Sequence, residues 1–362
     1  MIKDNPRLPA RSLLLHRVLL ACVAVVVVGF AIFVVSIRWH FYEDLCEGLE
    51  RAREHVRANA LFCGRCARFD AAGKEASSLA VQAAIAANRC PEGALANIHM
   101  LVYLRMPKVG SSTMVLLFQA LSHRNDYVNN RVAWRQIRNE SALVEYMESL
   151  PYQTSHANHG PLLNFRYTPA TMIHLREPVS RFLSHYDYLR WGPRPFIARV
   201  KMRFRNEPSY YYTTLDECIH IETRRANTTN RKLIRSAMLD TCFRDAFWVT
   251  LYLCGWDAFC SEKRSPLAHQ QALRNLEEKV LIVGLTEQFD RSVAMAEKIL
   301  PSFFRGATAL VKTIPKQRVN ERKRSVVTMH SLVKSMLKYE ISIYTRGAEI
   351  FNAQQRCVLF SQ

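Results

Sequence analysis

Hydrophobic runs that suit buried strands alternate along the chain with stretches of helical periodicity. Three apolar runs are each followed directly by a helix-like stretch. This alternation favours an α/β domain in which helices flank a central, mostly parallel sheet. Two amphipathic helices are expected near the C-terminus. The expected strands are 100–105, 171–175 and 280–285, and the expected helices are 113–122, 178–190, 287–300, 326–337 and 339–351.

A different hydrophobic pattern occupies the N-terminus. Residues 1–17 form a short basic segment, and residues 18–37 form an apolar run that contains no charged residue. About 20 apolar residues are enough to cross a bilayer as a helix, and the run is longer than the apolar region of a cleaved signal peptide. Positive charge before the span predicts a cytoplasmic N-terminus and a lumenal remainder. We therefore expect a single-pass type II signal-anchor, a helical lumenal stem over residues 38–97 and a folded domain over residues 98–362.

The charge balance indicates an anionic partner. Among 362 residues, 50 Lys and Arg outnumber 31 Asp and Glu, for a net charge of +19. Nucleic acid, an anionic membrane surface or an acidic polymer would each fit this charge. Asn139-Glu-Ser and Asn227-Thr-Thr are glycosylation sequons, which agree with a lumenal domain. No nucleic acid is expected in a lumen, so we expect an acidic glycan or lipid as the partner.

The cysteines indicate disulfides rather than a metal site. Ten cysteines are many for a cytosolic protein of this size and favour an oxidising compartment. Cys63 and Cys66 resemble a redox or zinc half-site, but no second pair follows at zinc spacing, which favours a structural or intersubunit disulfide. A second group is expected to form two disulfides. It comprises Cys218, Cys242, Cys254 and Cys260.

The first candidate site follows the strand that is expected to end at residue 105. Its loop contains a Lys, a Gly and three hydroxyl residues, and it leads into a helix. The N–H groups and dipole of a helix N-terminus favour an anion, and hydroxyl side chains can donate to that anion or cap the helix. The triphosphatase loop is excluded because the Lys precedes the Gly, whereas an ordinary capped strand–turn–helix stays open. The loop residues are Lys108, Val109, Gly110, Ser111, Ser112 and Thr113.

The second candidate site is also a loop that follows a predicted strand and leads into a helix. A strand ends at Arg176, Pro178 suits the first turn of the next helix, and Ser184 lies about two turns further on. Arg presents a fixed fork of donors that suits phosphate oxygens. In a parallel α/β sheet both loops lie at the carboxyl ends of strands, where ligands bind. Two separate anion sites indicate a cofactor with two phosphate-type groups.

Together these two motifs resemble a known enzyme family. Pro-Lys-x-x-Ser-x-Thr after one strand, followed by Arg-Glu-Pro-x-x-Arg-x-x-Ser after another, is the pairing of Golgi carbohydrate sulfotransferases. The chain is most similar to the heparan sulfate 2-O-sulfotransferase and uronyl 2-sulfotransferase family, which includes the insect Pipe proteins. The similarity runs in order over residues 98–320, through Leu215-Asp-Glu-Cys218, Leu253-Cys-Gly255, Val283-Gly-Leu-Thr-Glu287 and Leu300-Pro-Ser-Phe-Phe-Arg-Gly-Ala-Thr308.

The resemblance implies a P-loop-like sulfotransferase fold and a Golgi membrane enzyme. Such an enzyme uses 3′-phosphoadenosine 5′-phosphosulfate (PAPS) as sulfate donor and needs no metal. Residues 108–113 would hold the 5′-phosphosulfate, and Arg176 and Ser184 would hold the 3′-phosphate. Arg305 would be a fold or cofactor contact, and Arg105 would lie near the acceptor. The family layout also implies a homo-oligomer and the disulfide pairs Cys218–Cys242 and Cys254–Cys260.

A catalytic base is implied as well. The family's catalytic histidine precedes Leu-[Asp/Asn]-Phe, which makes His159 the base here, with His156 as its local rival. A sugar hydroxyl is a poor nucleophile at neutral pH, and a histidine can take its proton during attack. Sulfuryl transfer also needs a cation at the developing charge of the leaving group, a role that falls to Lys108.

The chain departs from the family pattern near the expected acceptor. Glu177 stands in place of the usual Asp, Gly160 and Pro161 follow the expected base, and Pro193 occupies a position that is often acidic. The expected acceptor is an acidic glycosaminoglycan, sulfated at the 2-hydroxyl of a uronic acid. The alternatives are a sulfotransferase for another glycan or position, and an inactive relative that binds acidic glycans.

Overall fold

The computed structural model describes residues 66–87, 89–90, 94–130, 139–191, 213–225, 230–314, 328 and 330–359. The expected membrane span, residues 38–65 of the expected stem and the sequon at Asn227 lie outside these ranges. Within them, no helix has the length and apolar character that a membrane crossing requires. All described residues belong to one unit of the chain, His55–Gln362.

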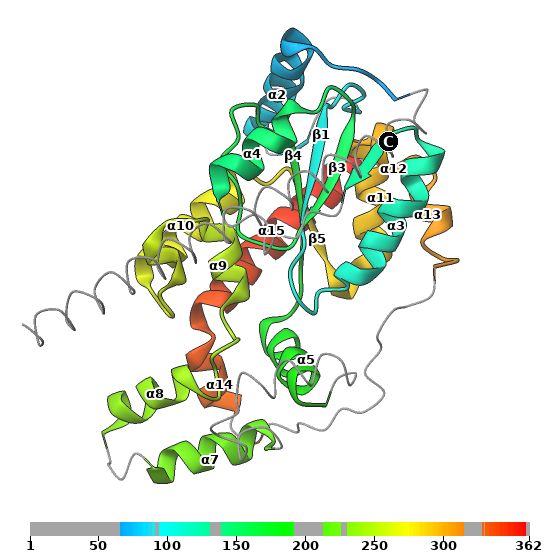
Figure 1. The fold of residues 1–362 in the computed structure, drawn as a ribbon. Coiled ribbons are helices and arrows are strands. Elements are labelled where there is room, and N and C mark those ends of the chain that lie inside the picture. Colours follow the sequence, from blue (N-terminus) through cyan, green and yellow to red (C-terminus); the bar gives the residue numbers. More distant parts are fainter. Residues whose placement is uncertain are drawn as a thin grey trace, which may run out of the picture. The chain divides into compact units, whose positions relative to one another are not determined.

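A parallel sheet of five strands lies at the centre of this unit, in the order β2-β3-β1-β4-β5 (Figure 1). Every residue of β1, β4 and β5 is buried, as expected for parallel strands that are covered on both faces. The predicted α/β fold with a parallel sheet is therefore confirmed. The strands are β1 (Met100–Leu104), β2 (Val128–Asn130), β3 (Thr154–Asn158), β4 (Ala170–Leu175) and β5 (Ile282–Leu285).

Two of these strands were not expected, because their residues are mostly polar. In β3 the sequence Thr-Ser-His-Ala-Asn is fully buried. Three of its polar side chains bond one another or the neighbouring strand: Ser155 Oγ donates to Asn129 Oδ1 at 3.0 Å, and Thr154 Oγ1 lies 3.0 Å from His156 Nε2. A search for apolar runs cannot find strands of this kind.

Helices connect the strands and complete the C-terminal part of the chain. The helices expected after the first, second and third predicted strands are present as α3, α5 and α11, and the two C-terminal helices as α14 and α15. The helical segments are α2 (Ala71–Ala86), α3 (Ser111–Arg124), α4 (Glu140–Ser149), α5 (Pro178–Trp191), α7 (Leu215–Arg225), α8 (Arg231–Asp240), α9 (Trp248–Cys254), η2 (Ala258–Ser261), α10 (Pro266–Glu278), η3 (Thr286–Gln288), α11 (Phe289–Ile299), α12 (Pro301–Phe304), α13 (Ala307–Leu310), α14 (His330–Met336) and α15 (Lys338–Leu359).

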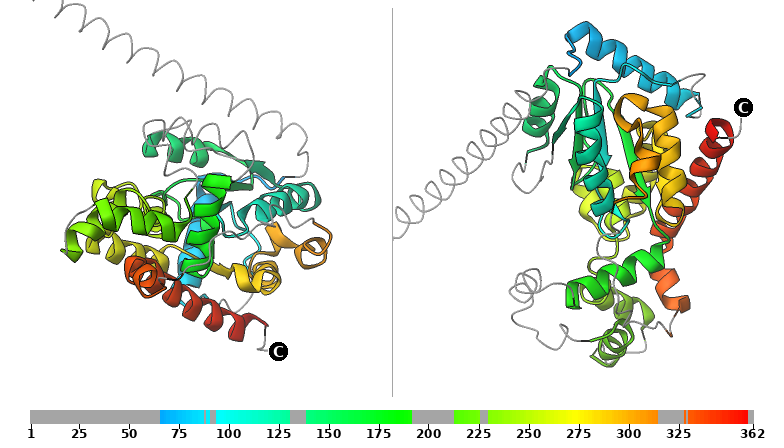
Figure 2. Two further views of the ribbon diagram at one scale, coloured as in Figure 1. Left: turned by 90° about the horizontal axis from the view of Figure 1, so that it is seen from below. Right: turned by 90° about the vertical axis from the view of Figure 1, so that its right-hand side faces the viewer.

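Buried apolar side chains form two separate clusters. The larger one, the sheet core, includes residues of β1, β4, β5, α3 and α11. The smaller one, the helical core, lies beyond the carboxyl ends of the strands, among α5, α7, α8 and α14 (Figure 2). Helix α15 joins them, because Ile341 packs against the helical core while Ile343 and Phe351 belong to the sheet core. The helical core comprises Val179, Phe182, Tyr186, Leu215, Cys218, Ile219, Met238, Cys242, Phe243, Ala246, Phe247, Val333, Met336 and Leu337.

Disulfides hold both clusters. The pairs Cys218–Cys242 and Cys254–Cys260 are present, as the family layout implied. A third bond, Cys90–Cys357, ties the segment before β1 to α15. Helix α2 contributes Val81 and Ala84 to the sheet core. Helix α2, which lies within the expected stem, therefore packs on the sheet.

Candidate active site

The carboxyl edge of the sheet collects residues that are far apart in the sequence. Arg105 directly follows β1, His159 follows β3, Arg176 follows β4 and Thr286 follows β5. The register aligns these ends, because Leu104 pairs with Asn158 and Leu175 pairs with Leu285. Ligands of parallel α/β sheets bind at this edge. The structure thus brings three of the predicted site residues together with one that was not predicted.

The loop after β1 opens the N-terminus of α3. Lys108 and Gly110 both adopt the left-handed conformation, with φ of 67° and 78°. Gly110 is the N-cap of α3 and has no side chain that could cap the first turn. Any side chain at Gly110 would be strained and would meet the Phe289 ring at 3.4 Å. Because the N-cap residue leaves the first N–H groups uncapped, this helix start suits an anion.

The predicted hydroxyl caps are inside the helix instead of before it. Helix α3 begins at Ser111, so Ser111, Ser112 and Thr113 occupy its first turn rather than the N-cap position. Ser111 is buried, whereas Ser112 and Thr113 are half-buried. The two half-buried hydroxyls remain available as donors toward an anion at the helix start.

Two side chains from neighbouring strand ends brace this loop. Arg176 donates from Nη1 to the carbonyl oxygen of Lys108 at 3.1 Å. Thr286 Oγ1 lies 3.0 Å from the carbonyl oxygens of both Val109 and Leu175. The loop is therefore fixed to β4 and β5, which pre-organises the helix start before a ligand arrives.

Glu177, which replaces the family's usual Asp, caps helix α5. Its carboxylate accepts the N–H groups of Val179 at 3.0 Å and Ser180 at 2.7 Å. Burial alone would raise the pKa of Glu177, but these hydrogen bonds and the charge of Lys334 lower it overall. The longer side chain thus keeps the anionic N-cap that an Asp would provide.

Helix α5 presents three further polar residues to the site. Lys108 Nζ lies 4.4 Å from the centre of the Tyr188 ring, and Ser184, half-buried, precedes Tyr188 by one helical turn on the same side. His185 is buried, and its Nδ1 atom has no hydrogen-bond partner among the described residues. Burial and the charges of Arg181 and Lys108, with a smaller effect of His159, hold the pKa of His185 well below its usual range.

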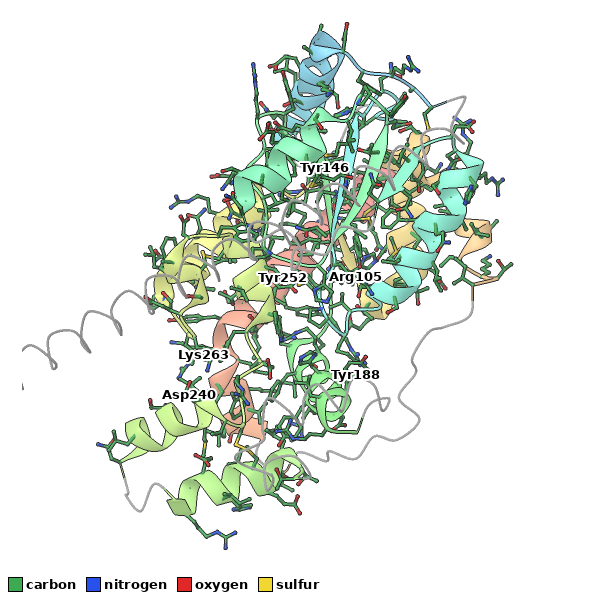
Figure 3. All side chains as sticks on the ribbon, viewed as in Figure 1. Arg105, Tyr146, Tyr188, Asp240, Tyr252 and Lys263 are labelled. Atoms are coloured by element: carbon green, nitrogen blue, oxygen red, sulfur yellow. A yellow bond between two sulfur atoms is a disulfide. The ribbon has the colours of Figure 1, made fainter. Side chains whose placement is uncertain are left out.

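His159, which directly follows β3, is hydrogen-bonded to a tyrosine on helix α9. Its Nδ1 atom lies 2.7 Å from the hydroxyl of Tyr252 on α9. The Tyr252 ring meets the Trp248 ring edge-on at 5.5 Å, and Trp248 in turn lies 6.0 Å from the His185 ring. Arg105 adjoins the chain next to His159, because its backbone N–H donates to the carbonyl of Asn158 at 2.7 Å. Figure 3 shows Arg105 at the end of β1, Tyr188 on α5 and Tyr252 on α9.

The rival histidine is part of the sheet interior. His156 lies within β3, is fully buried and has its Nε2 atom 3.0 Å from Thr154 Oγ1. Burial, with a smaller effect of His99, lowers the pKa of His156 to about 3. A side chain that is enclosed in the sheet cannot reach an acceptor sugar. Of the two histidines, only His159 stands at the edge where the anion loop opens.

Arg305 is not brought to the loop. Its carbonyl oxygen accepts from Asn125 Nδ2 at 3.2 Å, at the C-terminal end of α3. Helix α3 has 14 residues, which separate this end from the loop by about 20 Å. The exposed Arg305 side chain thus starts at the opposite end of α3, and the expected cofactor contact gains no support here.

Besides Thr286, three contributors to the site were missed by sequence reasoning. Tyr252 lies in a short apolar helix before Cys254, and nothing local links it to His159. Tyr188 and His185 follow Ser184 closely, so their helical spacing was a usable signal. Within the described residues, no group of three or more His, Cys, Asp or Glu is placed to hold a metal ion.

The sequence comparisons agree with this architecture. A profile of the sulfotransferase family matches residues 94–351. Heparan sulfate 2-O-sulfotransferase 1 of Gallus gallus is 25% identical over 258 residues, which cover 67% of this chain and 66% of the relative. Heparan sulfate 2-O-sulfotransferase hst-2 of Caenorhabditis elegans is 28% identical over 239 residues, covering 62% and 67%. Uronyl 2-sulfotransferase of Mus musculus is 26% identical over 280 residues, covering 70% and 63%.

Because the profile spans most of the chain, the protein belongs to the sulfotransferase family. The resemblance expected from the two anion motifs is thereby confirmed. The chain spans about two thirds of the length of the curated relatives it matches.

Proposed function

We propose that this protein is a glycosaminoglycan sulfotransferase of the Golgi membrane. It transfers sulfate from PAPS to the 2-hydroxyl of a uronic acid in heparan sulfate or in dermatan or chondroitin sulfate. The observation that carries this proposal is the convergence of Lys108, Arg176 and His159 at one edge of the sheet. Family membership and the named activities of the relatives support it.

The donor fits the two anion-binding features of this edge. The first turn of α3, which its N-cap residue leaves uncapped, and Lys108 would bind the 5′-phosphosulfate. Arg176 and Ser184, on the strand end and helix that follow β4, would bind the 3′-phosphate. Arg176 uses one Nη1 bond to brace the loop, and a guanidinium has further N–H groups for a ligand. Binding at one end of the donor therefore supports the geometry at the other.

The reaction needs a proton acceptor and a charge stabiliser. The acceptor hydroxyl oxygen forms a bond to sulfur while the bond between sulfur and the bridging phosphate oxygen breaks. His159 takes the hydroxyl proton, and the departing 5′-phosphate keeps the electron pair of the broken bond. Lys108 and the first N–H groups of α3 offset the charge that grows on that phosphate. The proton on His159 then passes to solvent, which restores the base.

The acceptor is proposed from charge. The net charge of +19 suits a polyanion, and Arg105, whose backbone N–H bonds the carbonyl of Asn158 next to His159, would supply a cation to it. Type II anchoring in the Golgi membrane follows from the apolar run at residues 18–37 and is part of the proposal. Protease protection of the C-terminal part in microsomes tests it: a digested domain would contradict lumenal orientation.

The direct test is an assay with radiolabelled PAPS on heparosan, dermatan and chondroitin, followed by disaccharide analysis. We expect label on the 2-hydroxyl of a uronic acid, and a loss of about 10²–10⁴ in turnover for His159→Ala. His123→Ala is the matched control, because His123 is exposed in the last turn of α3. Label on another carbon would favour a different sulfotransferase. Binding to heparin without turnover of PAPS would favour an inactive glycan-binding relative.

A further inference from the structure

The bond between His159 and Tyr252 raises a question that the proposed function leaves open. A neutral imidazole carries one proton, and the partner of one ring nitrogen decides which nitrogen holds it. The His159 Nδ1 atom and the Tyr252 hydroxyl are 2.7 Å apart. A phenol hydroxyl can donate or accept, so this distance fits two arrangements with opposite consequences for catalysis.

Only one arrangement leaves a basic nitrogen for the acceptor. If Tyr252 donates to Nδ1, the ring proton lies on Nε2, and His159 has no lone pair left to receive a proton. If Nδ1–H donates to Tyr252, the lone pair lies on Nε2. We propose that Tyr252 is a positioning residue that accepts the Nδ1–H bond and so holds His159 in the tautomer whose Nε2 atom takes the acceptor proton. This inference rests on His159 being the base.

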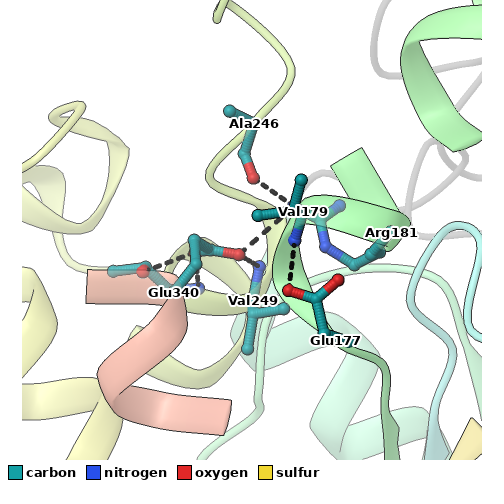
Figure 4. A network of polar contacts seen from close by, with 7 residues as sticks. Glu177, Val179, Arg181, Ala246, Val249 and Glu340 are labelled. Carbon is teal, nitrogen blue, oxygen red and sulfur yellow. Dashed lines mark hydrogen bonds and ion pairs between the residues drawn. The ribbon is translucent and has the colours of Figure 1, made fainter. Parts of the chain in front are cut away.

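Tyr252 is suited to this role because α9 is fixed at its start. The first residues of α9 receive no cap from Phe247. Instead, Glu340 of α15 accepts the N–H of Thr250 at 2.8 Å, the Thr250 hydroxyl at 2.7 Å and the N–H of Val249 at 3.2 Å. Arg181 of α5 binds Glu340 at 3.3 Å and donates to the carbonyl of Ala246 as well (Figure 4).

The end of α9 is fixed too. Asn275 of α10 donates from Nδ2 to the carbonyls of Leu253 at 2.7 Å and Cys254 at 3.0 Å. Cys254 is also bonded to Cys260. Tyr252 itself is only 1% exposed. Its hydroxyl therefore has a defined position, so a single hydrogen bond can orient the His159 ring.

The surroundings of His159 make this bond useful during transfer. Tyr252 of α9 bonds His159, and the charges of Arg181, Lys108 and His159 all act on His185 of α5. Arg105 bonds the neighbouring strand end, next to His159, through its backbone N–H. Cations at this edge of the sheet oppose a second proton on His159. A hydroxyl oxygen that accepts from Nδ1–H stabilises the imidazolium formed when Nε2 takes the proton. Tyr252 would thus offset part of this repulsion.

The test compares Tyr252→Phe with Tyr127→Phe in the full chain. Tyr127 is a matched control, since it is equally buried but donates to the Phe118 carbonyl at 3.1 Å, away from the site. For Tyr252→Phe we expect a fall of about 10- to 100-fold in kcat, with the KM for PAPS within about twofold, because the donor contacts are untouched. The acid limb of the kcat profile should move to lower pH, since the protonated ring loses its partner. Tyr127→Phe should leave kcat and the profile in place.

A spectroscopic measurement decides the tautomer without relying on activity. Nitrogen NMR of histidine-labelled full-length protein, with the His159 signal assigned through its absence in His159→Gln, should show the proton on Nδ1. A proton on Nε2, or an acid limb that moves to higher pH in Tyr252→Phe, would overturn the proposed tautomer. These outcomes leave the proposed function standing, which fails instead if His159→Gln retains turnover or PAPS is not used.

Discussion

The sheet core and the helical core contribute different parts of the site. Strand ends of the sheet supply the anion loop, Arg176 and His159, the proposed base. Helices around the second core supply Tyr188 and His185, and α9 supplies Tyr252. The difference teaches that strand register positions the proposed donor site, whereas the docking of helices against that edge sets the environment of the proposed base.

The largest effect is expected where the two cores are joined. Glu340→Gln leaves the buried Arg181 charge without its counter-ion, because both side chains are 0% exposed. Breaking a buried pair in this way costs about 3–5 kcal/mol of unfolding free energy, which thermal or denaturant unfolding measures. Glu349→Gln is the control on the same helix, since its pair with Arg346 is exposed and is worth about 1 kcal/mol or less. Equal effects in both variants would contradict a stabilising role for the buried pair between α5 and α15.

An intermediate effect is expected within the helical core. Cys218→Ser with Cys242→Ser opens a loop of sequence separation 24, which should lower the unfolding free energy by about 3 kcal/mol. The comparison pair Cys254→Ser with Cys260→Ser opens a loop of separation 6 and should cost about 2 kcal/mol. Limited proteolysis should cut the first variant in α7 or α8 while the sheet resists. Cleavage of the sheet at the same rate would mean that the two cores unfold as one.

The smallest change in unfolding free energy, counted per residue, is expected when the pH is lowered. Burial lowers the pKa of His99 to about 4 and those of His156 and His174 to about 3, and all three lie on or beside the sheet. The unfolded chain takes up these protons near pH 6.5, so stability is complete above that pH and falls as the pH drops toward 4. Each histidine should cost about 2 kcal/mol between pH 7 and pH 5.

Unfolding midpoints measured across this range check the acid effect. His156→Gln should flatten the pH dependence, because it removes one group that the unfolded chain protonates and the folded sheet excludes. A midpoint that does not change from pH 7 to pH 5 would contradict neutral burial of these histidines. An unchanged slope in His156→Gln would place the acid sensitivity outside the sheet.

Much of the fold and part of the site could be predicted from the sequence. The apolar runs of β1, β4 and β5 predicted the sheet, and parallel strands necessarily bring Lys108 and Arg176 to one edge. The polar strands β2 and β3 were missed, because their residues form no apolar run, and only some of their buried polar side chains bond one another. Tyr252 was also missed, since it is separated from His159 by 93 positions in the sequence. Their contact depends on the docking of a helix, which no local sequence pattern indicates.

Lys108→Ala tests the central claim most directly, that the loop after β1 stabilises the transferring group of PAPS. The measurement is kcat with saturating PAPS and acceptor, beside Lys298→Ala, which removes an exposed lysine from α11. Lys108→Ala should fold normally and lose about 10²–10³ in kcat, while Lys298→Ala should match the unmodified protein. Full turnover by Lys108→Ala would contradict the assignment of this edge as the site of sulfate transfer.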